Sequence, residues 1–449
     1  MPRRLFILGA TGSIGTSALD VVRDFARQRD HLGSHGDLHG GSHGGSHGGL
    51  HGGLHGDLHG DSHGSRDFTA KGLPPQFEVV GLAAAKNGAL LLEAAREFGV
   101  RAVAIADPSV EVVVPANVEL LRGARAACEI LERHAQPGDL VLASMVGAAG
   151  IEPVLTAIAR GCDIALANKE ALVAAGAIVM PAAQRAGVRI IPVDSEHNAL
   201  FQCLKSSTSM DEVRRVVLTA SGGPFRRRSR AEMANVTVDD ALAHPTWRMG
   251  PKVTVDSASL MNKALELIEA HWLFGLESGR IDAIVHPQSI VHGFVEYLDG
   301  SVLAQLSPPD MRTPIQQALC DPERFDGPSR KLDFTSLRSL EFEPVDTERF
   351  PAILLAHRVI EAGGDAGATF NAANEIAVEA FLARRIPFLA IPEIVRETLD
   401  AEPVRPIASL EDVLAADRRA RIRATEAVAR CEELASNAAR GQTATIAKA

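Results

Sequence analysis

Short apolar runs alternate with amphipathic segments through the first part of the chain. The runs have the length expected of buried strands, and the segments between them carry apolar residues at helical spacing. The apolar runs are residues 4–8, 77–84, 102–106, 140–144 and 163–167. This alternation is typical of a doubly wound parallel sheet. We therefore predict an α/β protein whose first domain covers residues 1–193.

The pattern changes in the remainder of the chain. Strand-like runs and helical segments mix between residues 194 and 320, which indicates a central α+β domain with the catalytic and metal-binding residues. Residues 321–347, rich in Pro, Asp and Arg, predict a connector. Alanine-rich amphipathic segments follow and indicate a helical C-terminal domain over residues 348–449.

A glycine-rich turn, Gly9-Ala-Thr-Gly-Ser-Ile-Gly15, follows the first apolar run. Its glycines let the backbone pass close to a pyrophosphate, which would lie on the N–H groups that open the next helix. One glycine fingerprint is weak evidence, but a strand before it and a helix after it are the context that dinucleotide binding requires. Lys86 and Asn87 follow the second run, at the place where an NAD enzyme usually has an acidic residue. The residues therefore favour a Rossmann-type domain that binds NADP.

Two acidic residues, Asp194 and Glu196, follow the apolar run 190–193. Residues two apart on extended backbone point the same way, so both carboxylates leave the strand end together. Two oxygen ligands on one face are half of a site for a hard divalent cation. The alternative is that Asp194 or Ser195 caps a helix that begins at Glu196.

A third acid, Glu266, lies in the segment 255–269, which we interpret as one helix. On a helix Asn262, Lys263 and Glu266 share one polar stripe, and the other positions are largely apolar. A surface ion pair between Lys263 and Glu266 is the alternative interpretation. Together with the two acids near the strand end, the stripe predicts a metal site with three carboxylate ligands.

Three loops carry further candidate residues. Asn168-Lys169-Glu170 follows an apolar run at the edge where open α/β sheets bind ligands, although a surface turn would have the same sequence. In Ser221-Gly-Gly-Pro224 the glycines allow backbone N–H groups to point at one anion. A hairpin turn is the alternative for this segment. The loop 244–250 contains Trp247, which is either a core residue or part of a lid that excludes water.

Composition narrows the classes of function. Charged residues are 23% of the chain and the net charge is −10, which argues against general binding to nucleic acid or acidic membranes. Five cysteines without Cys-x-x-Cys spacing resemble the reduced thiols of a cytoplasmic protein. We expect no signal peptide, because the N-terminus enters a strand at once, and no apolar run reaches the roughly 18 residues of a membrane span.

A histidine occurs at every fourth position from His31 to His63. The glycine content of this tract disfavours a helix, so we predict a disordered insertion over about residues 28–75. One interpretation is weak, multivalent capture of Zn²⁺ or Ni²⁺ by neutral imidazoles. The other, which we favour, is a repeat expansion in a surface loop, because long surface insertions cost little free energy.

Eight motifs occur in order along the chain. They are Gly-Ala-Thr-Gly-Ser-Ile-Gly (9–15), Ala-Asn-Lys-Glu (167–170), Val-Asp-Ser-Glu-His-Asn (193–198), Ser-Gly-Gly-Pro-Phe (221–225), His-Pro-Thr-Trp-Arg-Met-Gly (244–250), Val-Asp-Ser-Ala-Ser-Leu-Met-Asn-Lys (255–263), His-Pro-Gln-Ser-Ile-Val-His (286–292) and Phe-Asn-Ala-Ala-Asn-Glu (370–375). Together they resemble the 1-deoxy-D-xylulose 5-phosphate reductoisomerase family over nearly the whole chain outside the histidine tract.

The resemblance implies a homodimeric cytoplasmic enzyme of non-mevalonate isoprenoid precursor synthesis. It would use NADPH and a divalent cation, Mg²⁺, Mn²⁺ or Co²⁺, to convert 1-deoxy-D-xylulose 5-phosphate, a small sugar phosphate, to 2-C-methyl-D-erythritol 4-phosphate. The rearrangement would proceed by retro-aldol and aldol steps or by an α-ketol shift.

The resemblance also implies residue roles. The metal ligands would be Asp194, Glu196 and Glu266, which with Lys169 and His244 form the catalytic set. The substrate would contact Lys169, Ser195, Glu196, Ser221, His244, Ser257, Asn262, Lys263 and Glu266. NADPH would contact Thr11, Gly12, Ser13, Ile14, Ala85, Lys86, Asn87, Asn168, Glu170 and Gly250, and a flexible flap would carry Trp247 and Met249. One departure is Ala85, where the family usually has Gly; a positive φ there would strain an alanine.

Two other functions share part of the pattern. An NADP-dependent dehydrogenase without isomerase activity, of the semialdehyde or homoserine type, would have the same first domain but would need no metal. A metal-storage protein or nickel chaperone would rest on the histidine tract alone, and would bind many metal ions without oxidising NADPH.

The repeat-expansion hypothesis predicts that deletion of residues 31–63 leaves catalysis intact, because the tract would carry no catalytic group. The measurement is NADPH oxidation by the deletion variant and by the full chain under the same conditions. Loss of activity in a variant that still folds would contradict the hypothesis.

Overall fold

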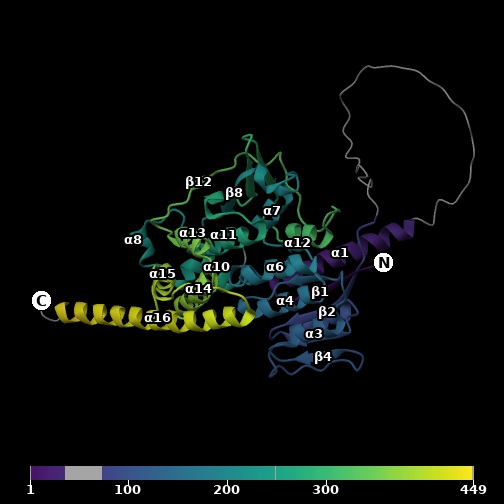
Figure 1. Cartoon of the computed structure of the whole chain (residues 1–449), viewed down its shortest axis with the longest axis horizontal. Helices are drawn as coiled ribbons and strands as arrows, with labels where there is room; N and C mark the ends of the chain where they lie inside the picture. Colours follow the sequence, from purple (N-terminus) through teal and green to yellow (C-terminus); the bar gives the residue numbers. More distant parts are fainter. Residues whose placement is uncertain (1, 36–72, 248, 447–449) are drawn as a thin grey trace, which may run out of the picture.

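The computed structural model describes residues 2–35, 73–247 and 249–446. Figure 1 shows three packed parts along the colour gradient: an N-terminal sheet with its helices, a second sheet with helices in the middle of the chain, and a set of C-terminal helices. The long α16 (Leu410–Ile446) extends past the other helices at the C-terminal end. The α/β fold class and the helical C-terminal region are confirmed, whereas the exact domain boundaries stay predictions.

The N-terminal sheet has seven parallel strands in the order β4-β3-β2-β1-β5-β6-β7. Its strands are β1 (Arg3–Leu8), β2 (Phe77–Ala84), β3 (Ala102–Ile105), β4 (Glu119–Arg122), β5 (Leu140–Ala143), β6 (Asp163–Leu166) and β7 (Ile190–Pro192). Its helices are α1 (Ser13–His35), α2 (Gly88–Glu97), α3 (Ala126–His134), the short η2 (Ala148–Gly150), α4 (Ile151–Ala159), α5 (Glu170–Val173) and α6 (Gly176–Ala186). Strand order reverses between β1 and β5, which is where such sheets bind ligands.

Both faces of this sheet are buried, which explains its continuous apolar strands. Leu5 and Ile7 of β1 belong to one apolar cluster, with α1 and α2, whereas Phe6 and Leu8 belong to another, with α3, α4 and α6. The alternation follows from the two-residue period of a strand. The carboxyl ends of the strands are therefore held rigidly at one edge.

The second sheet has five strands in the order β11-β10-β8-β9-β12 and is mixed, because β8 and β9 are parallel while the other pairs are antiparallel. Its strands are β8 (Val213–Ala220), β9 (Ile281–Val285), β10 (Val291–Tyr297), β11 (Val302–Leu306) and β12 (Glu343–Pro344). The helical elements of this part are α7 (Ser195–Leu204), η3 (Met210–Glu212), α8 (Arg230–Met233), α9 (Val238–Leu242), α10 (Pro251–Ala258), α11 (Met261–Phe274), η4 (Ser278–Arg280) and α12 (Arg312–Cys320). Helices α7 and α11 pack on the sheet and carry the acidic residues described below.

The C-terminal part consists of α13 (Ala352–Ala362), α14 (Ala366–Leu382), α15 (Ala390–Ala401) and α16. Helix α14 lies at its centre and contacts α5 and α10 as well as its three helical neighbours. Gly367 of α14 lies so close to α5 that an added Cβ would be 2.0 Å from the Val173 carbonyl oxygen. The C-terminal helices are thus packed directly onto the segment that follows β6.

Two sequence predictions are corrected by the structure. Segment 255–269 is two helices rather than one, because Leu260 has a φ of 58° and separates α10 from α11. The histidine tract was predicted to be disordered from about residue 28, but α1 continues to His35. Residues 36–72, with the other histidines of the tract, lie outside the described residues.

Candidate active site

The candidate site lies at the carboxyl edge of the N-terminal sheet. The glycine turn follows β1, Ser144 follows β5, Asn168 follows β6 and Asp194 follows β7, and these four strands are neighbours in that order. Ser144 Oγ donates a hydrogen bond to the Leu8 carbonyl oxygen at 2.7 Å, which ties the ends of β1 and β5 together. Parallel strands thus bring four distant loops to one edge.

Three carboxylates meet beside this edge. Asp194 lies at the N-terminus of α7, Glu196 in its first turn and Glu266 in α11, and each offers an oxygen atom within 4.8 Å of the others. The Asp194 side chain makes no capping hydrogen bond and instead lies 2.5 Å from Lys169 Nζ. Asp194 thus occupies a capping position without capping.

Two lysines compensate the negative charge. Lys169 Nζ also lies 2.9 Å from Asn262 Oδ1 and 3.2 Å from Glu266 Oε1. Lys263 Nζ donates to Glu266 and lies 3.6 Å from Glu196 Oε1. Lys263 and Glu266 are buried, so their pair is not the surface ion pair that the sequence left open.

The environment of the cluster shifts the pKa values of Asp194 and Glu196 in opposite directions. Burial would raise the pKa of Asp194, but the charges of Lys169 and His197 and the hydrogen bonds with Glu196 and Lys169 together outweigh burial and hold that pKa below its usual range. Burial raises the pKa of Glu196 to about 8, and the charges of Glu266 and Asp194 add to the effect although Lys263 opposes it. Burial alone would lower the pKa of Lys169 and Lys263, yet their acidic neighbours raise both. The lysines are therefore charged at neutral pH.

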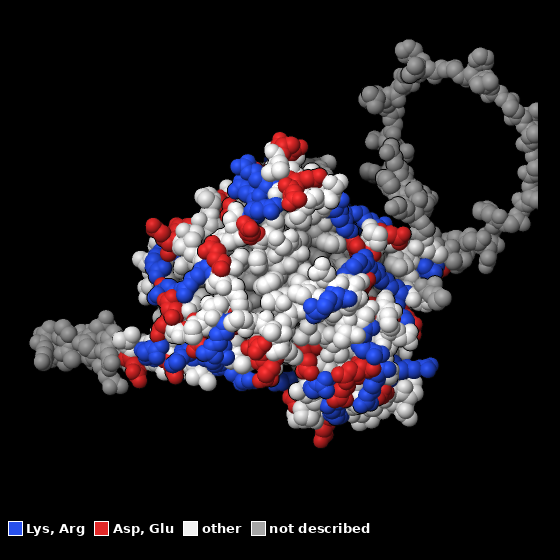
Figure 2. Space-filling view, viewed as in Figure 1, with Lys and Arg blue, Asp and Glu red and all other residues white. Residues whose placement is uncertain are grey.

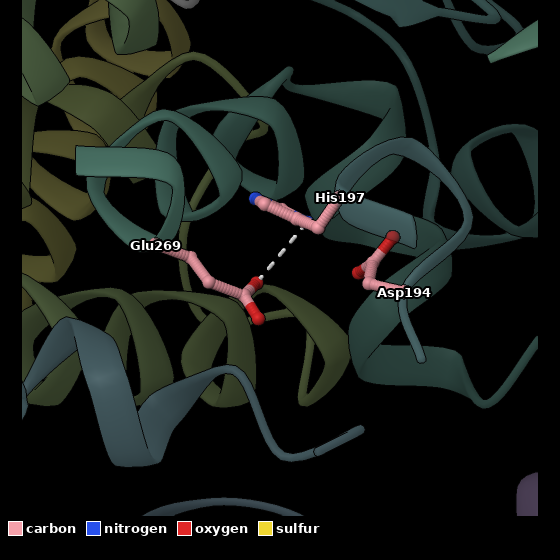
Figure 3. Close-up of side chains that lie close together, drawn as sticks. All are labelled: Asp194, His197 and Glu269. Carbon is pink, nitrogen blue, oxygen red and sulfur yellow. Dashed lines mark ion pairs between the residues drawn. The ribbon is translucent and has the colours of Figure 1, made fainter. Parts of the chain in front are cut away.

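The donor chemistry fits a hard divalent cation. Oxygen ligands are those that Mg²⁺ and Mn²⁺ prefer, and the cluster supplies them from three residues. A second group, Asp194, His197 and Glu269, also has its ligand atoms within 4.8 Å of one another. Figure 3 shows these three side chains facing one another, with a dashed line for the contact between His197 and Glu269.

The second group is better described as a support of the first. His197 is fully buried, and its Nε2 lies 2.8 Å from the Glu266 carbonyl oxygen, to which it donates. Glu269 is also fully buried, and neither of its carboxyl oxygens has a hydrogen bond. Burial, and then the charge of Asp194, raise the pKa of Glu269 well above its usual range. A protonated Glu269 therefore faces His197 Nδ1 at 3.5 Å.

A second polar cluster is formed by two serines and a histidine. His244 Nε2 lies 3.0 Å from Ser221 Oγ and 3.1 Å from Ser257 Oγ. The backbone N–H groups of Thr246 and Trp247 donate to His244 Nδ1, so a neutral His244 carries its proton on Nε2. Burial lowers the pKa of His244 and favours this neutral form. The cluster can present hydroxyl and imidazole donors to an anion.

The segment after β8 has the backbone expected of an anion-binding turn. Gly222 and Gly223 have φ values of 80° and 63°, and the Gly223 N–H donates to Ser221 Oγ at 3.2 Å. The turn leads toward α8 and does not join neighbouring antiparallel strands, so the hairpin interpretation is wrong.

The tryptophan loop is not part of a buried core. Trp247 is half-buried, and its ring centroid is 6.5 Å from that of His292 in β10. The loop ends at Gly250, which is the N-cap of α10, and Met249 beside it is also half-buried. This placement fits a lid better than a core aromatic.

The glycine turn has room for a ligand. An added Cβ on Gly9 or Gly15 would be within 2.5 Å of backbone oxygen, whereas one on Gly12 would meet nothing closer than 3.4 Å. Gly12 and Ser13 are exposed, and Thr11 and Ile14 are partly exposed. The backbone N–H groups that open α1 therefore face an accessible surface, as pyrophosphate binding requires.

The other predicted cofactor residues are distributed over two loops. Ala85, Lys86 and Asn87 are exposed after β2, and Asn87 Oδ1 caps α2 by accepting from Leu90 N–H at 3.1 Å. Ala85 does not have a positive φ, so its methyl group causes no strain of that kind. After β6, Asn168 Nδ2 donates to the Met145 carbonyl oxygen at 2.7 Å and to Glu170 Oε2 at 2.9 Å.

Comparison with known proteins agrees with this geometry. Profiles of the 1-deoxy-D-xylulose 5-phosphate reductoisomerase domain match residues 5–32 and 69–176, and profiles of its C-terminal domains match residues 190–274 and 306–423. The reductoisomerase of Zymomonas mobilis is 43% identical over 428 residues, covering 94% of this chain and 97% of that protein. The chain belongs to the 1-deoxy-D-xylulose 5-phosphate reductoisomerase family.

Other members of the reductoisomerase family support the assignment. The Burkholderia multivorans protein is 43% identical and covers 96% of this chain and 98% of its own length. A solved Zymomonas mobilis reductoisomerase in complex with NADPH has a TM-score of 0.78 and 41% identity, covering 95% of this chain and 99% of that one. Another solved reductoisomerase, in complex with NADPH, fosmidomycin and magnesium, has a TM-score of 0.77 and 34% identity. The match covers 95% of this chain and 98% of that one.

Sequence reasoning within this family pattern missed the buried pair of His197 and Glu269. The available signal was spacing: Glu269 is three residues after Glu266 on an apolar helix, and His197 directly follows Glu196. It also assigned no role to Asn371, Asn374 or Glu375 of the last motif, which lie on α14.

The protonated state of Glu269 predicts a pH-dependent stability. The unfolded carboxyl ionises above its ordinary pKa of 4.5, whereas the folded one keeps its proton. Its contribution is therefore fully present below that pKa and is lost as the pH rises toward the raised value. Glu269→Gln should weaken this loss as the pH rises above 4.5. Thermal unfolding over this pH range, in the presence of a chelator, measures the pH dependence of stability. Glu379→Gln, at an exposed position, is the control. Equal pH dependence of Glu269→Gln and wild type would contradict a protonated Glu269.

Proposed function

We propose that this chain converts 1-deoxy-D-xylulose 5-phosphate to 2-C-methyl-D-erythritol 4-phosphate with NADPH and a divalent cation. The observation that carries the proposal is the meeting of Asp194, Glu196 and Glu266 beside Lys169, at the sheet edge that also carries the glycine turn. The rearrangement leaves the molecular formula unchanged and gives an aldehyde, whose carbon then accepts a hydride while its oxygen accepts a proton.

The carboxylate cluster would hold the cation. When bound, the cation supplies Lewis-acid polarisation of neighbouring substrate oxygens, and NADPH supplies the hydride. Lys169, 2.5 Å from Asp194, would orient that carboxylate and donate to the substrate. Ser195 Oγ donates to Glu196 Oε2 at 2.7 Å and would hold this carboxylate in place.

The serine and histidine cluster would bind the substrate away from the reacting carbons. Ser221, Ser257 and the Gly223 N–H can donate to a phosphate, and Asn262 and Lys263 lie on the next helix. His244 holds both serines and would contact the sugar. Binding energy from a remote phosphate can be used to hold the rearranging fragments.

The loop 244–250 would close over the substrate. Trp247 and Met249 would exclude water from the metal, while Gly250 would contact NADPH together with the turns at Thr11–Ile14 and Ala85–Asn87. Asn168 and Glu170 lie at the same edge and would complete the cofactor site.

A dehydrogenase without isomerase activity is a weaker candidate. Such an enzyme would need the glycine turn and the neighbouring strand ends, but it would have no use for three carboxylates held within 4.8 Å of one another. The carboxylate cluster therefore favours the reductoisomerase.

We also propose a homodimer that acts in the cytoplasm. Strand β11 is at the edge of its sheet, and Val302 and Leu303 are 52% and 40% exposed, with Leu298 nearby at 70%. An apolar edge strand is a surface that usually finds a partner. All five cysteines are free, which suits a reducing compartment. None of the described helices is long and apolar enough to span a membrane.

Surface charge agrees with a small-molecule enzyme. Figure 2 shows Lys and Arg intermixed with Asp and Glu around the rim of one face, with a large uncharged area between them. Nucleic-acid binding would call for a continuous basic band, which this face does not display.

NADPH oxidation in the presence of 1-deoxy-D-xylulose 5-phosphate tests the function. The chelator-treated chain should be inactive and should regain turnover with Mn²⁺ or Mg²⁺. Glu266→Gln should fold but lose at least about 100-fold in kcat/KM, because even indirect partners of a metal are worth up to that factor. Glu379→Gln is the matched control. Full turnover without metal, or wild-type turnover of Glu266→Gln, would refute the metal assignment.

The dimer proposal predicts that charge on β11 separates the protomers. A variant with Val302→Lys and Leu303→Lys should elute at half the mass of the wild type, because two lysines cannot be buried without partners. Val113→Lys, at an 89% exposed position of the N-terminal part, is the control. Light scattering after size exclusion measures the mass, and an unchanged mass of the β11 variant would exclude this surface.

A further inference from the structure

An ion pair with a buried carboxylate lies at the base of the tryptophan loop. The loop ends at Gly250, Pro251 begins α10, and Lys252 and Asp256 are one turn apart on this helix. Lys252 Nζ lies 2.8 Å from Asp256 Oδ2, and Asp256 is only 1% exposed. Lys252 is half-buried, at 23% exposed, and the buried Asp256 carboxylate needs further partners to offset its loss of hydration.

The partners come from two other parts of the chain. Asn374 of α14, which is fully buried, donates from Nδ2 to Asp256 Oδ1 at 2.9 Å. On the other side, Lys252 Nζ lies 3.9 Å from Glu170 Oε1, and Glu170 accepts from Asn168. The contacts thus run from the C-terminal helices through α10 to the end of β6.

The chain of contacts flanks groups that the proposed function uses. Asp256 directly precedes Ser257, whose hydroxyl lies 3.1 Å from His244. Glu170 directly follows Lys169, which contacts Asp194. Thr254 Oγ1 donates to the Gly250 carbonyl oxygen at 3.0 Å, so the loop end is also bound to α10. A shift of α10 would therefore move the proposed phosphate donor and the base of the lid together.

We propose that Lys252, Asp256 and Asn374 are positioning residues for the sugar phosphate: they hold α10 so that Ser257 and the loop 244–250 face the strand end that carries Asn168 to Glu170. The inference rests on the proposed function, because it concerns affinity for that substrate. It also gives a role to the motif 370–375, of which no member lies in the carboxylate cluster. Loss of the contact should raise the KM for the sugar phosphate more than the dissociation constant of NADPH, because NADPH would also be held by the turns at Thr11–Ile14 and Ala85–Asn87.

The test uses isosteric changes on one helix. Asn374→Asp replaces the donor amide by a carboxylate that repels Asp256. Asn371→Asp is the matched control, because Asn371 is also fully buried on α14 and also faces an acid, Glu375 at 3.1 Å, but it has no hydrogen bond to α10. The double variant Asp256→Asn with Asn374→Asp restores a donor and an acceptor with their places exchanged, and it keeps the charge available to Lys252.

KM and kcat for 1-deoxy-D-xylulose 5-phosphate, the dissociation constant of NADPH without substrate, and the melting temperature are measured for all four proteins. Asn374→Asp should raise KM about tenfold, since small displacements far from the chemistry can cost up to about 100-fold. Its dissociation constant for NADPH should change by less than its KM, relative to the control, and the double variant should recover most of the KM.

The outcomes separate this proposal from the proposed function. An inactive wild type would overturn the proposed function. An active wild type with equal KM values for Asn374→Asp and Asn371→Asp, or a double variant without recovery, would overturn the positioning role alone. If Asn374→Asp does not fold, Asn374→Ala and its control Asn371→Ala are compared instead. A higher KM for Asn374→Ala than for Asn371→Ala would then support the positioning role, and equal KM values would overturn it.

Discussion

Mutual repulsion among one buried and two half-buried carboxylates is the constraint on which this site depends. Asp194, Glu196 and Glu266 place oxygen atoms within 4.8 Å of one another, where screening by water is weak. Lys169 and Lys263 supply compensating charge, and a divalent cation held by the carboxylates would supply more of it. Three carboxylates held so close together are unfavourable unless they bind a cation. Cation binding is therefore a better interpretation of these residues than a helix cap or a surface ion pair.

The two sheets share the task of bringing these acids together. The parallel sheet places Lys169 and Asp194 on neighbouring strand ends, whereas Glu266 comes from α11, which packs on the second sheet. Lys169 joins the two parts, because it follows β6 of the first sheet and its Nζ lies 3.2 Å from Glu266 Oε1 of α11. A site built at such a junction can combine a cofactor held by one domain with a substrate and metal held by the other.

The C-terminal helices contribute in a different manner. Helix α14 contacts α5 through Gly367 and α10 through Asn374, so it joins the segments that flank Lys169 and Ser257. Removal of one partner from a buried charged network usually costs about 3–5 kcal/mol, because the remaining charge is left uncompensated. The conformation of α10, and with it the base of the tryptophan loop, is therefore tied to helices that lie outside the candidate site.

The sequence by itself determined the elements whose signals are local. The strand, glycine turn and helix at the N-terminus, the alternation of the first domain, the spacing of Asp194 and Glu196 and the stripe of Asn262, Lys263 and Glu266 depend on residues a few positions apart. Tertiary structure alone decided which alternative each residue takes. The Asp194 side chain pairs with Lys169 instead of capping, the helix breaks at Leu260, and Asn374 reaches Asp256 across 118 residues. These outcomes depend on burial and on contacts between distant segments, which no periodicity along the chain records.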